Sequence, residues 1–275
     1  MGHADNAGRA TVHLWCAWPD DLLDEATARA CEGLLSEEEQ GRLGRFKFER
    51  HRREFLATRV LQRRALSAYA EVGPEAWRFE LGKYGKPAIA ADLGVYGAGG
   101  NARGIRFNLS NSLGLVVCAV TDGLEVGVDV EPATRAGTIE EVAEKFFSAR
   151  ELEQFRALGG EARRDRGLTL WTLKEAYMKA RGLGMALSTK LFSFVFEDGG
   201  AIGLEMDVEA GDGAGRWRFC TLDHAGHRIA LMVESKRVPE LEVWEVRPAL
   251  GEPRRVGVGE VKWFGGNQQG SEPAS

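Results

Sequence analysis

Cysteine is scarce in this chain and shows no spacing pattern. The 275 residues include four cysteines, with no C-x-x-C pair and no zinc-ligand spacing: Cys16, Cys31, Cys118 and Cys220. Disulfide scaffolds and zinc modules depend on such patterns, so neither class is indicated. We therefore expect four free thiols, a reducing compartment and a cytoplasmic protein.

Long apolar runs are also lacking. The first residues, MGHADNAGRATVHLW, do not show the basic-then-apolar pattern of a secretory signal. No run approaches the roughly 20 apolar residues that cross a bilayer, so we expect no membrane association. The net charge of -5 gives no reason to expect nucleic-acid binding. With 44% hydrophobic residues, the chain can bury a sizeable core.

Positive charge is concentrated in one block. Between Arg42 and Arg64 there are eight Arg and one Lys against two Glu. In an acidic protein, such a block is a candidate binding site for a polyanion. It is equally typical of a solvated, Arg-rich helix face, and the sequence alone leaves both interpretations open.

Hydrophobic periodicity predicts an α+β protein with two lobes that meet near residues 110–130. Expected helices cover 21–39, 50–70, 139–145, 149–158 and 168–181, the last ending at Gly182. Expected strands cover 11–15, 115–120, 124–131 and 241–246, with two or three more up to 234. We expect a glycine-rich connection at 91–104 and a mobile basic loop at 159–167.

Two carboxylates occupy alternate positions of one predicted strand. Asp129 and Glu131 are two residues apart, so both point to the same side, while valines on the opposite side anchor the strand in the core. Parallel carboxylates suit a hard divalent cation such as Mg²⁺. The alternative is that these acids face water on a half-buried strand.

A second pair of charged residues lies on the predicted helix 168–181. Glu175 and Lys179 are spaced i, i+4 and share one helix face, which is usually the pattern of a surface salt bridge. Combined with Asp129 and Glu131, they have a chemical use, because a metal and a lysine together can neutralise a diphosphate that a hydroxyl attacks. Glu175 could ligate the metal or accept the proton.

Two polar segments could donate hydrogen bonds to phosphate oxygens. One is Phe107-Asn108-Leu109-Ser110-Asn111-Ser112, and the other is the tight basic turn Lys83-Tyr84-Gly85-Lys86-Pro87. Taken singly, the first is also typical of a turn or cap and the second of an exposed loop.

In this order the motifs resemble those of the Sfp-type 4′-phosphopantetheinyl transferases. The matching segments run from about residue 36 to 194: RFKFERHRREFLATRVLQR (45–63), GKP (85–87), FNLSNS (107–112), GVDVEP (127–132) and WTLKEAYMK (171–179). The resemblance implies two pseudo-twofold-related α+β lobes with coenzyme A in the cleft between them. The implied parts are an N-terminal lobe at 1–122, a C-terminal lobe at 123–247 and a partly disordered tail at 248–275.

The resemblance also implies roles for individual residues. Asp129, Glu131 and Glu175 would hold Mg²⁺ (or Mn²⁺), and Lys179 would contact the phosphates. The remaining coenzyme A contacts would come from Arg50, Lys83, Lys86, Ser110 and Asn111. A serine of an acyl or peptidyl carrier protein would attack the β-phosphate and release adenosine 3′,5′-bisphosphate, with Glu175 as the base and Asp129 and Lys179 assisting.

One position departs from the family pattern. The family usually has S-H-S where this chain has Ser110-Asn111-Ser112. Asparagine offers a neutral donor in place of a charge, which would weaken coenzyme A binding by about one charge-assisted hydrogen bond. A non-catalytic relative that binds coenzyme A or carrier proteins is therefore the main alternative, and a metal-dependent phosphohydrolase acting on nucleotides is the third reading.

The region between the two acidic motifs is the expected carrier-binding face. We expect its apolar residues to seat the carrier and its basic residues to steer it: Phe146, Phe147, Leu152 and Phe155, then Arg156, Arg163, Arg164 and Arg166. The sequence does not distinguish fatty acid, polyketide and nonribosomal peptide carriers. Two lobes in one chain could complete the site, so we expect a monomer.

Overall fold

The computed structural model describes residues 10–22, 24–93, 104–247 and 249–265. Most of the glycine-rich connection expected at 91–104, and nearly all of the tail end expected to be disordered, lie outside these described residues. No helix within the described ranges is long and apolar enough to span a membrane.

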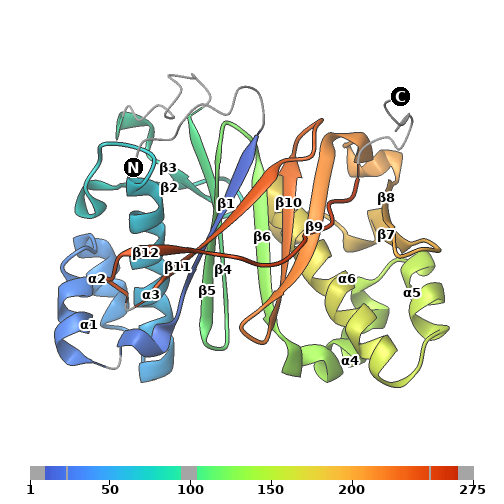
Figure 1. Ribbon diagram of the computed structural model, residues 1–275, viewed down its shortest axis with the longest axis horizontal. Coiled ribbons are helices and arrows are strands. Elements are labelled where there is room, and N and C mark those ends of the chain that lie inside the picture. Colours follow the sequence, from blue (N-terminus) through green and yellow to red (C-terminus); the bar gives the residue numbers. More distant parts are fainter. Residues whose placement is uncertain (1–9, 23, 94–103, 248, 266–275) are drawn as a thin grey trace.

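The chain uses the same succession of elements twice (Figure 1). The first half comprises β1 (Thr11–Ala17), α1 (Glu25–Glu32), α2 (Glu37–Leu43), α3 (Glu49–Ser67), β2 (Phe79–Leu81), β3 (Pro87–Ile89), β4 (Ile105–Ser112) and β5 (Leu115–Asp122). The second comprises β6 (Val126–Pro132), α4 (Ala136–Phe146), α5 (Ala149–Arg156), α6 (Gly160–Arg181), β7 (Phe192–Phe196), β8 (Ile202–Met206), β9 (Trp217–His224) and β10 (His227–Glu234). Strand order β1-β5-β4 in one sheet matches β6-β10-β9 in the other. The α+β class is therefore confirmed.

Two strands near the C-terminus return to the first sheet. β11 (Glu240–Val246) pairs in parallel with β1, and β12 (Pro253–Val256) pairs with β11, giving the order β12-β11-β1-β5-β4. The resemblance implies a second lobe that extends to residue 247, but strand pairing puts β11 in the first sheet. The pairing of β11 with β1 cannot be predicted from the local sequence, because it joins residues far apart in the chain.

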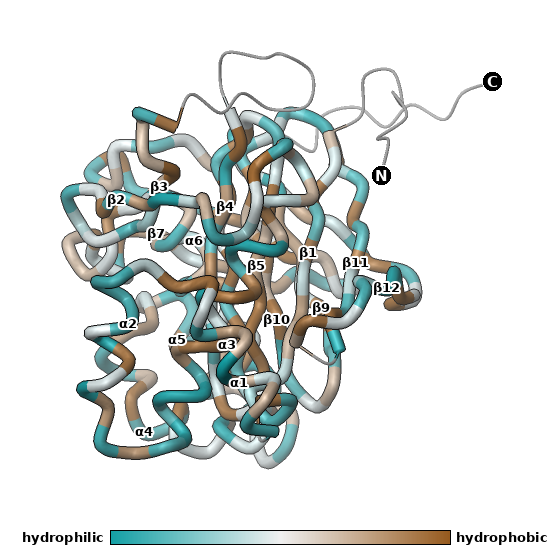
Figure 2. Tube along the Cα trace, turned by 90° about the vertical axis from the view of Figure 1, so that its left-hand side faces the viewer, coloured by the Kyte–Doolittle hydropathy of each residue, from teal (hydrophilic) through white to brown (hydrophobic). Residues whose placement is uncertain are grey.

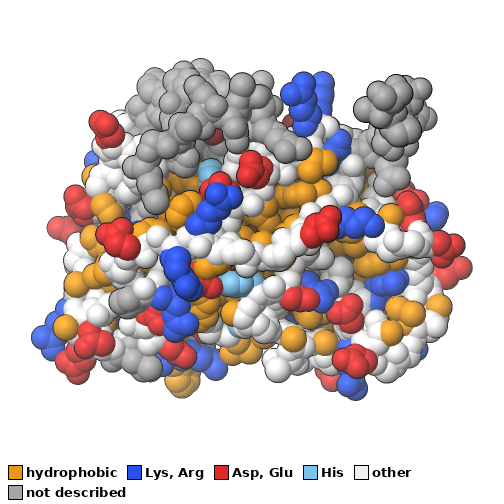
Figure 3. Space-filling view, viewed as in Figure 1, with side chains coloured by type: hydrophobic (Ala, Val, Ile, Leu, Met, Phe, Trp, Pro, Cys, Tyr) orange, Lys and Arg blue, Asp and Glu red, His pale blue; other side chains and the backbone are white. Residues whose placement is uncertain are grey.

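The helices lie on one side of the two sheets, and the C-terminal segment crosses the other side (Figures 1 and 2). Cores form between α3 and the first sheet and between α6 and the second. A third cluster is shared by the opposite faces of both sheets: Val12, Leu14, Leu115, Val117, Val126, Val128, Val130, Ile229 and Leu231. Val258, Val261 and Trp263 pack on this cluster, and hydrophobic side chains gather there in the space-filling view (Figure 3). The shared core makes the two halves one body.

Two helical predictions needed correction. The expected helix at 21–39 divides into α1 and α2, because Gly33 ends the first and Ser36 forms a capping box with Glu39 that starts the second. The expected loop at 159–167 is wrong, since α6 begins at Gly160. Arg163 donates to the carbonyls of Leu158 and Arg156, which satisfies the C-terminal end of α5 and orders this turn.

Candidate functional site

Side chains, rather than a backbone ladder, join β4 to β6 where the two halves meet. The β4 residues Asn108, Ser110 and Ser112 alternate along the strand, so all three point toward β6. Asn108 Oδ1 accepts from Val128 N at 2.9 Å, and Ser110 Oγ accepts from Val130 N at 3.3 Å. The alternative interpretation of 107–112 as a turn or cap is therefore wrong: the segment is a strand whose polar side chains bind backbone N–H groups of β6.

Asp129 lies at the centre of this junction and is 4% exposed. Its Oδ1 accepts from Ser110 Oγ at 3.0 Å and from Lys179 Nζ at 2.7 Å, and Lys179 also donates to Ser110 at 2.8 Å. Its Oδ2 is buried without a hydrogen-bond partner in the part of the chain that the structure describes. One oxygen of this carboxylate therefore lacks a donor or cation among the described residues.

Glu131 lies two residues along β6 and is equally buried. Its Oε2 accepts from Ser112 Oγ at 3.0 Å, and its Oε1 accepts from Trp171 Nε1 at 3.0 Å and from Arg135 Nη1. The interpretation that Asp129 and Glu131 merely face water is wrong. Both are enclosed by β4 and α6.

Glu175 completes the acidic group from α6. It is half-buried, and burial, together with the charge of Asp129, raises the pKa of its carboxyl above the usual value. Burial also raises the pKa of Asp129, although Lys179 opposes that shift. The site thus holds carboxyl groups whose ionisation costs free energy until a cation balances them.

The donor set fits a divalent cation, although the side chains are not arranged around one. Within the described ranges, no three His, Cys, Asp or Glu side chains are grouped so that they could hold a metal ion as they stand. The orphaned Asp129 Oδ2 and the raised pKa values of Asp129 and Glu175 are nevertheless what a hard cation would relieve. Binding would require the carboxylates to exchange their present partners.

Lys86 ties the β2–β3 hairpin to the second half of the chain. Its Nζ donates to Glu125 Oε2 at 2.9 Å, to Val126 O at 3.3 Å and to Ala180 O at 2.9 Å. An ammonium group has three N–H donors, so all are engaged. Lys86 therefore shapes the cleft and has no free donor for a phosphate in this arrangement.

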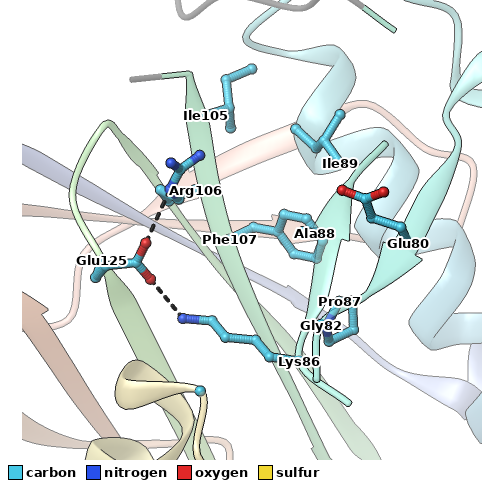
Figure 4. A pocket seen from close by; sticks show the side chains of 11 residues that line it. Glu80, Gly82, Lys86, Pro87, Ala88, Ile89, Ile105, Arg106, Phe107 and Glu125 are labelled. Atoms are coloured by element: carbon cyan, nitrogen blue, oxygen red, sulfur yellow. Dashed lines mark hydrogen bonds and ion pairs between the residues drawn. The ribbon is translucent and has the colours of Figure 1, made fainter. Parts of the chain in front are cut away.

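A cavity of about 460 Å³ opens beside Lys86 (Figure 4). Its walls include Pro87, Ile89, Ile105 and Phe107, and its rim includes Glu80, Arg106 and Glu125. Strands β4 and β6 both run from this cavity toward the carboxylates. Along the chain, Asp129 and Glu131 lie four and six residues beyond Glu125 of the rim, a distance of about 10–20 Å for an extended strand. The cavity and the acidic group thus lie along one junction.

Three predicted coenzyme A contacts make no hydrogen bond to the acidic group among the described residues. Arg50, Lys83 and Asn111 are exposed, and no hydrogen bond among the described residues joins them to Asp129, Glu131 or Glu175. Arg50 Nη2 lies 3.1 Å from His51 Nε2, and Lys83 lies over the Tyr84 ring. Their roles remain predictions.

Much of the basic block is structural. Four of its arginines bind acids or carbonyls within the first half and the returning segment: Arg52 to Glu32, Arg59 and Arg63 to Glu39, and Arg64 to Ala249 O and Gly251 O. Arg63 is 1% exposed. The polyanion interpretation can therefore apply only to the remaining cations of the block: Arg42, Arg45, Lys47, Arg50 and Arg53.

The expected carrier-binding residues are only partly on the surface. Phe147, Leu152 and Phe155 are buried in the core of the second half, so they cannot contact a partner. Phe146 is half-buried against Trp171. The arginines are engaged by nearby groups: Arg156 with Glu144, Arg163 with carbonyls, Arg164 with Glu140 and Arg166 over Phe196.

A buried ion pair next to the site in the chain was not predicted from the sequence. Lys174 precedes Glu175 on α6, and its Nζ lies 2.7 Å from Glu151 Oε2 with both side chains almost fully buried. It also donates to Thr189 O and Phe192 O, each at 2.8 Å. Burial lowers the pKa of Lys174 to about 8. The signal was Ser148-x-x-Glu151, a capping-box pattern whose Glu151 also accepts from Phe194 N.

This fold and this acidic junction define a class of protein: the chain belongs to the 4'-phosphopantetheinyl transferase superfamily. The profile of that superfamily matches residues 125–232. A second profile, described as 4'-phosphopantetheinyl transferase, N-terminal, matches residues 24–122. The two matches cover both halves and every motif on which the resemblance was based.

Two relatives identified by sequence, HetI and a Bacillus subtilis enzyme, agree with this assignment. The chain is 36% identical over 178 residues to the 4'-phosphopantetheinyl transferase HetI of a Nostoc species, covering 64% of this chain and 70% of HetI. It is 30% identical over 195 residues to a 4'-phosphopantetheinyl transferase of Bacillus subtilis, covering 71% and 81%. Among solved structures, a holo-[acyl-carrier-protein] synthase of Thermotoga maritima shares 29% identity at a TM-score of 0.34, over 41% of this chain and 64% of that chain.

Proposed function

We propose that this protein transfers the phosphopantetheine arm of coenzyme A to a serine of an acyl or peptidyl carrier protein and releases adenosine 3′,5′-bisphosphate. The observation that carries the proposal is the group of charged side chains at the junction of the halves: Asp129 and Glu131, which are buried, and Glu175 and Lys179, which are half-buried. Family membership supports the same reaction. The proposed carriers belong to fatty acid, polyketide or nonribosomal peptide synthesis.

Asp129, Glu131 and Glu175 would hold Mg²⁺ or Mn²⁺, which would supply positive charge beside the diphosphate. Lys179 is fixed by Ser110 and Asp129 and retains one N–H donor, so it can bind a phosphate oxygen. The cavity beside Lys86 has apolar walls and a polar rim, and it can accept the adenine of coenzyme A.

Glu175 is the proposed base. It accepts the proton of the carrier serine, directly or through one water, as the serine Oγ forms a bond to the β-phosphorus. The bond from that phosphorus to the bridging oxygen breaks, and adenosine 3′,5′-bisphosphate leaves. A carboxylate positioned beside the diphosphate can act as a general base in this way.

The setting of the reaction follows from the chain itself. The four cysteines are buried and unpaired, which supports a reducing, cytoplasmic setting. The shared core joins both halves of the site within one chain, which supports a monomer.

A product assay tests this proposal against its alternatives. The enzyme is incubated with coenzyme A, Mg²⁺ and an apo-carrier protein, and adenosine 3′,5′-bisphosphate is measured by chromatography. Release that requires the carrier, and that stops when the carrier serine is replaced by alanine, is expected. Release without a carrier would favour the phosphohydrolase. Coenzyme A binding without release would favour the non-catalytic relative, for which Asn111 is the single supporting feature.

A further inference from the structure

The carboxylate of Glu131 is bound by three side chains, one of which is positively charged. It accepts from Trp171, Ser112 and Arg135 at once. The guanidinium of Arg135 also lies over the Trp171 indole, 5.3 Å from the ring centroid. Arg135 and Trp171 therefore hold one carboxylate oxygen from two sides.

The two ends of this ion pair lie in different surroundings. The Arg135 side chain is 40% exposed, whereas that of Glu131 is 6% exposed. Arg135 can leave for water without a new burial cost, but Glu131 cannot. Trp171 also meets Phe146 edge-on, with ring centroids 5.0 Å apart, and this contact does not depend on the guanidinium.

In the part of the chain that the structure describes, the junction has more carboxylates than cations. Three carboxylates (Asp129, Glu131 and Glu175) interact with two cations, Lys179 and Arg135. Lys179 is anchored from inside by Ser110 and Asp129. Arg135 comes from the short 3-10 helix η4 (Ala133–Arg135) that follows β6, and it approaches from the solvent side. A metal ion that enters from solvent would therefore approach Arg135 before Lys179, and the two like charges would repel each other.

We propose that Arg135 is an internal counter-ion, which occupies the Glu131 carboxylate in the metal-free protein and is displaced when a divalent cation binds. This inference rests on the metal site in the proposed function. Arg135 is a positioning residue: it stabilises the acidic group when no metal is bound and lowers the affinity for the metal. Trp171 keeps Glu131 in place through the exchange.

Mn²⁺ binding to the full-length protein tests the exchange. Free Mn²⁺ is measured by electron paramagnetic resonance with wild type, Arg135→Gln and Arg135→Lys, with and without coenzyme A. Arg135→Gln is expected to bind Mn²⁺ about fivefold more tightly or better, because a repelling charge is gone and Glu131 is free. Arg135→Lys keeps the positive charge and should gain less Mn²⁺ affinity than Arg135→Gln. Arg150→Gln, an exposed change on α5, is the matched control.

Tryptophan fluorescence gives an arm that needs no Arg135 variant. Adding Mg²⁺ to wild type should change the emission as the guanidinium leaves the Trp171 indole, and Trp171→Phe should lack this change. If Arg135→Gln binds Mn²⁺ as tightly as wild type or more weakly, the inference about Arg135 is wrong, while the proposed function still stands. The same conclusion follows if Mg²⁺ changes the emission of wild type and Trp171→Phe identically. Failure of wild type to bind Mn²⁺ under either condition would overturn the metal site and this inference together.

Discussion

At the residue scale, the junction places like charges where water is scarce. Burial raises the pKa of both Asp129 and Glu175, and neighbouring carboxylates add to each shift. The unfolded chain has no such crowding, so ionisation of these groups favours unfolding in the metal-free protein. Features useful for binding a cation are therefore costly without one.

Replacing Glu175 by Gln should change how metal-free stability depends on pH. The folded-state pKa of Glu175 lies above its ordinary value of 4.5. The contribution of this carboxyl to stability is present below that ordinary value and is lost as the pH rises through the raised one. In EDTA, the unfolding free energy of Glu175→Gln should therefore gain on wild type as the pH rises through that window.

Urea unfolding at a series of pH values measures this difference. Glu153→Gln, on the exposed side of α5, is the charge-matched control. The account would be contradicted if the difference in unfolding free energy between Glu175→Gln and wild type did not change with pH, or changed as it does for Glu153→Gln. Added Mg²⁺ should stabilise wild type more than Glu175→Gln, because only wild type keeps all three carboxylates.

Lys174 should be essential for folding stability, although it touches no substrate. Replacement by Met leaves Glu151 buried and unpaired, which should lower the unfolding free energy by about 3–5 kcal/mol. Lys190→Met, at an exposed position, should change it by less than about 0.5 kcal/mol. Denaturant midpoints of the two variants provide the comparison. A similar small effect for both would show that the buried pair is not needed.

At the scale of elements, the site depends on how closely β6 approaches α6. A Cβ added at Gly127 would lie 2.0 Å from Ala176 O and 2.4 Å from Ala180 N, both backbone atoms. Because both atoms belong to the backbone of α6, no side-chain movement could make room for the added Cβ. The glycine therefore lets the strand that carries Asp129 and Glu131 lie directly against the helix that carries Glu175 and Lys179.

Gly127→Ala should force β6 and α6 apart. We expect a loss of about 3 kcal/mol or more in unfolding free energy and a loss of Mn²⁺ affinity, because the carboxylates separate. Gly137→Ala on α4 is the control, since nothing lies within 4 Å of its added Cβ. That change should be neutral or stabilising by up to about 1 kcal/mol. Equal stabilities for the two variants would contradict this packing.

Local pattern predicted part of the site, and long-range pairing determined the rest. The period of two correctly placed Asp129 and Glu131 on one side of β6 with valines on the other. Their burial was not predictable, because Ser110 and Ser112 come from the other half of the chain. The helical spacing likewise predicted the Glu175–Lys179 face, but not that Lys179 would reach Asp129.

At the scale of the whole molecule, three features fix the halves relative to each other. They share the third hydrophobic cluster, the C-terminal segment crosses both sheets, and Lys86 joins the first half to β6 and α6. The repeated order of elements was not visible in the sequence, because the two halves share topology and not residues. Their junction forms the site.

Lys86→Met should therefore weaken the junction through structure rather than through lost phosphate binding. Three hydrogen bonds to the second half disappear, which should lower the unfolding free energy by about 1–2 kcal/mol, with weaker coenzyme A binding as a consequence. Lys83→Met removes the same charge three residues away without such bonds, and its stability should match wild type. Calorimetric binding and thermal unfolding of both variants separate the two effects. Weaker binding by Lys86→Met with unchanged stability would instead assign Lys86 to the phosphates.

The central claim is tested most directly by the intact mass of an apo-carrier protein incubated with this enzyme, coenzyme A and Mg²⁺. The account predicts a gain of one phosphopantetheine on the carrier serine, abolished by a chelator and by Glu175→Ala. The contradicting result is no gain in mass for any acyl or peptidyl carrier, although coenzyme A is shown to bind. That result would have to hold for wild type and for Asn111→His.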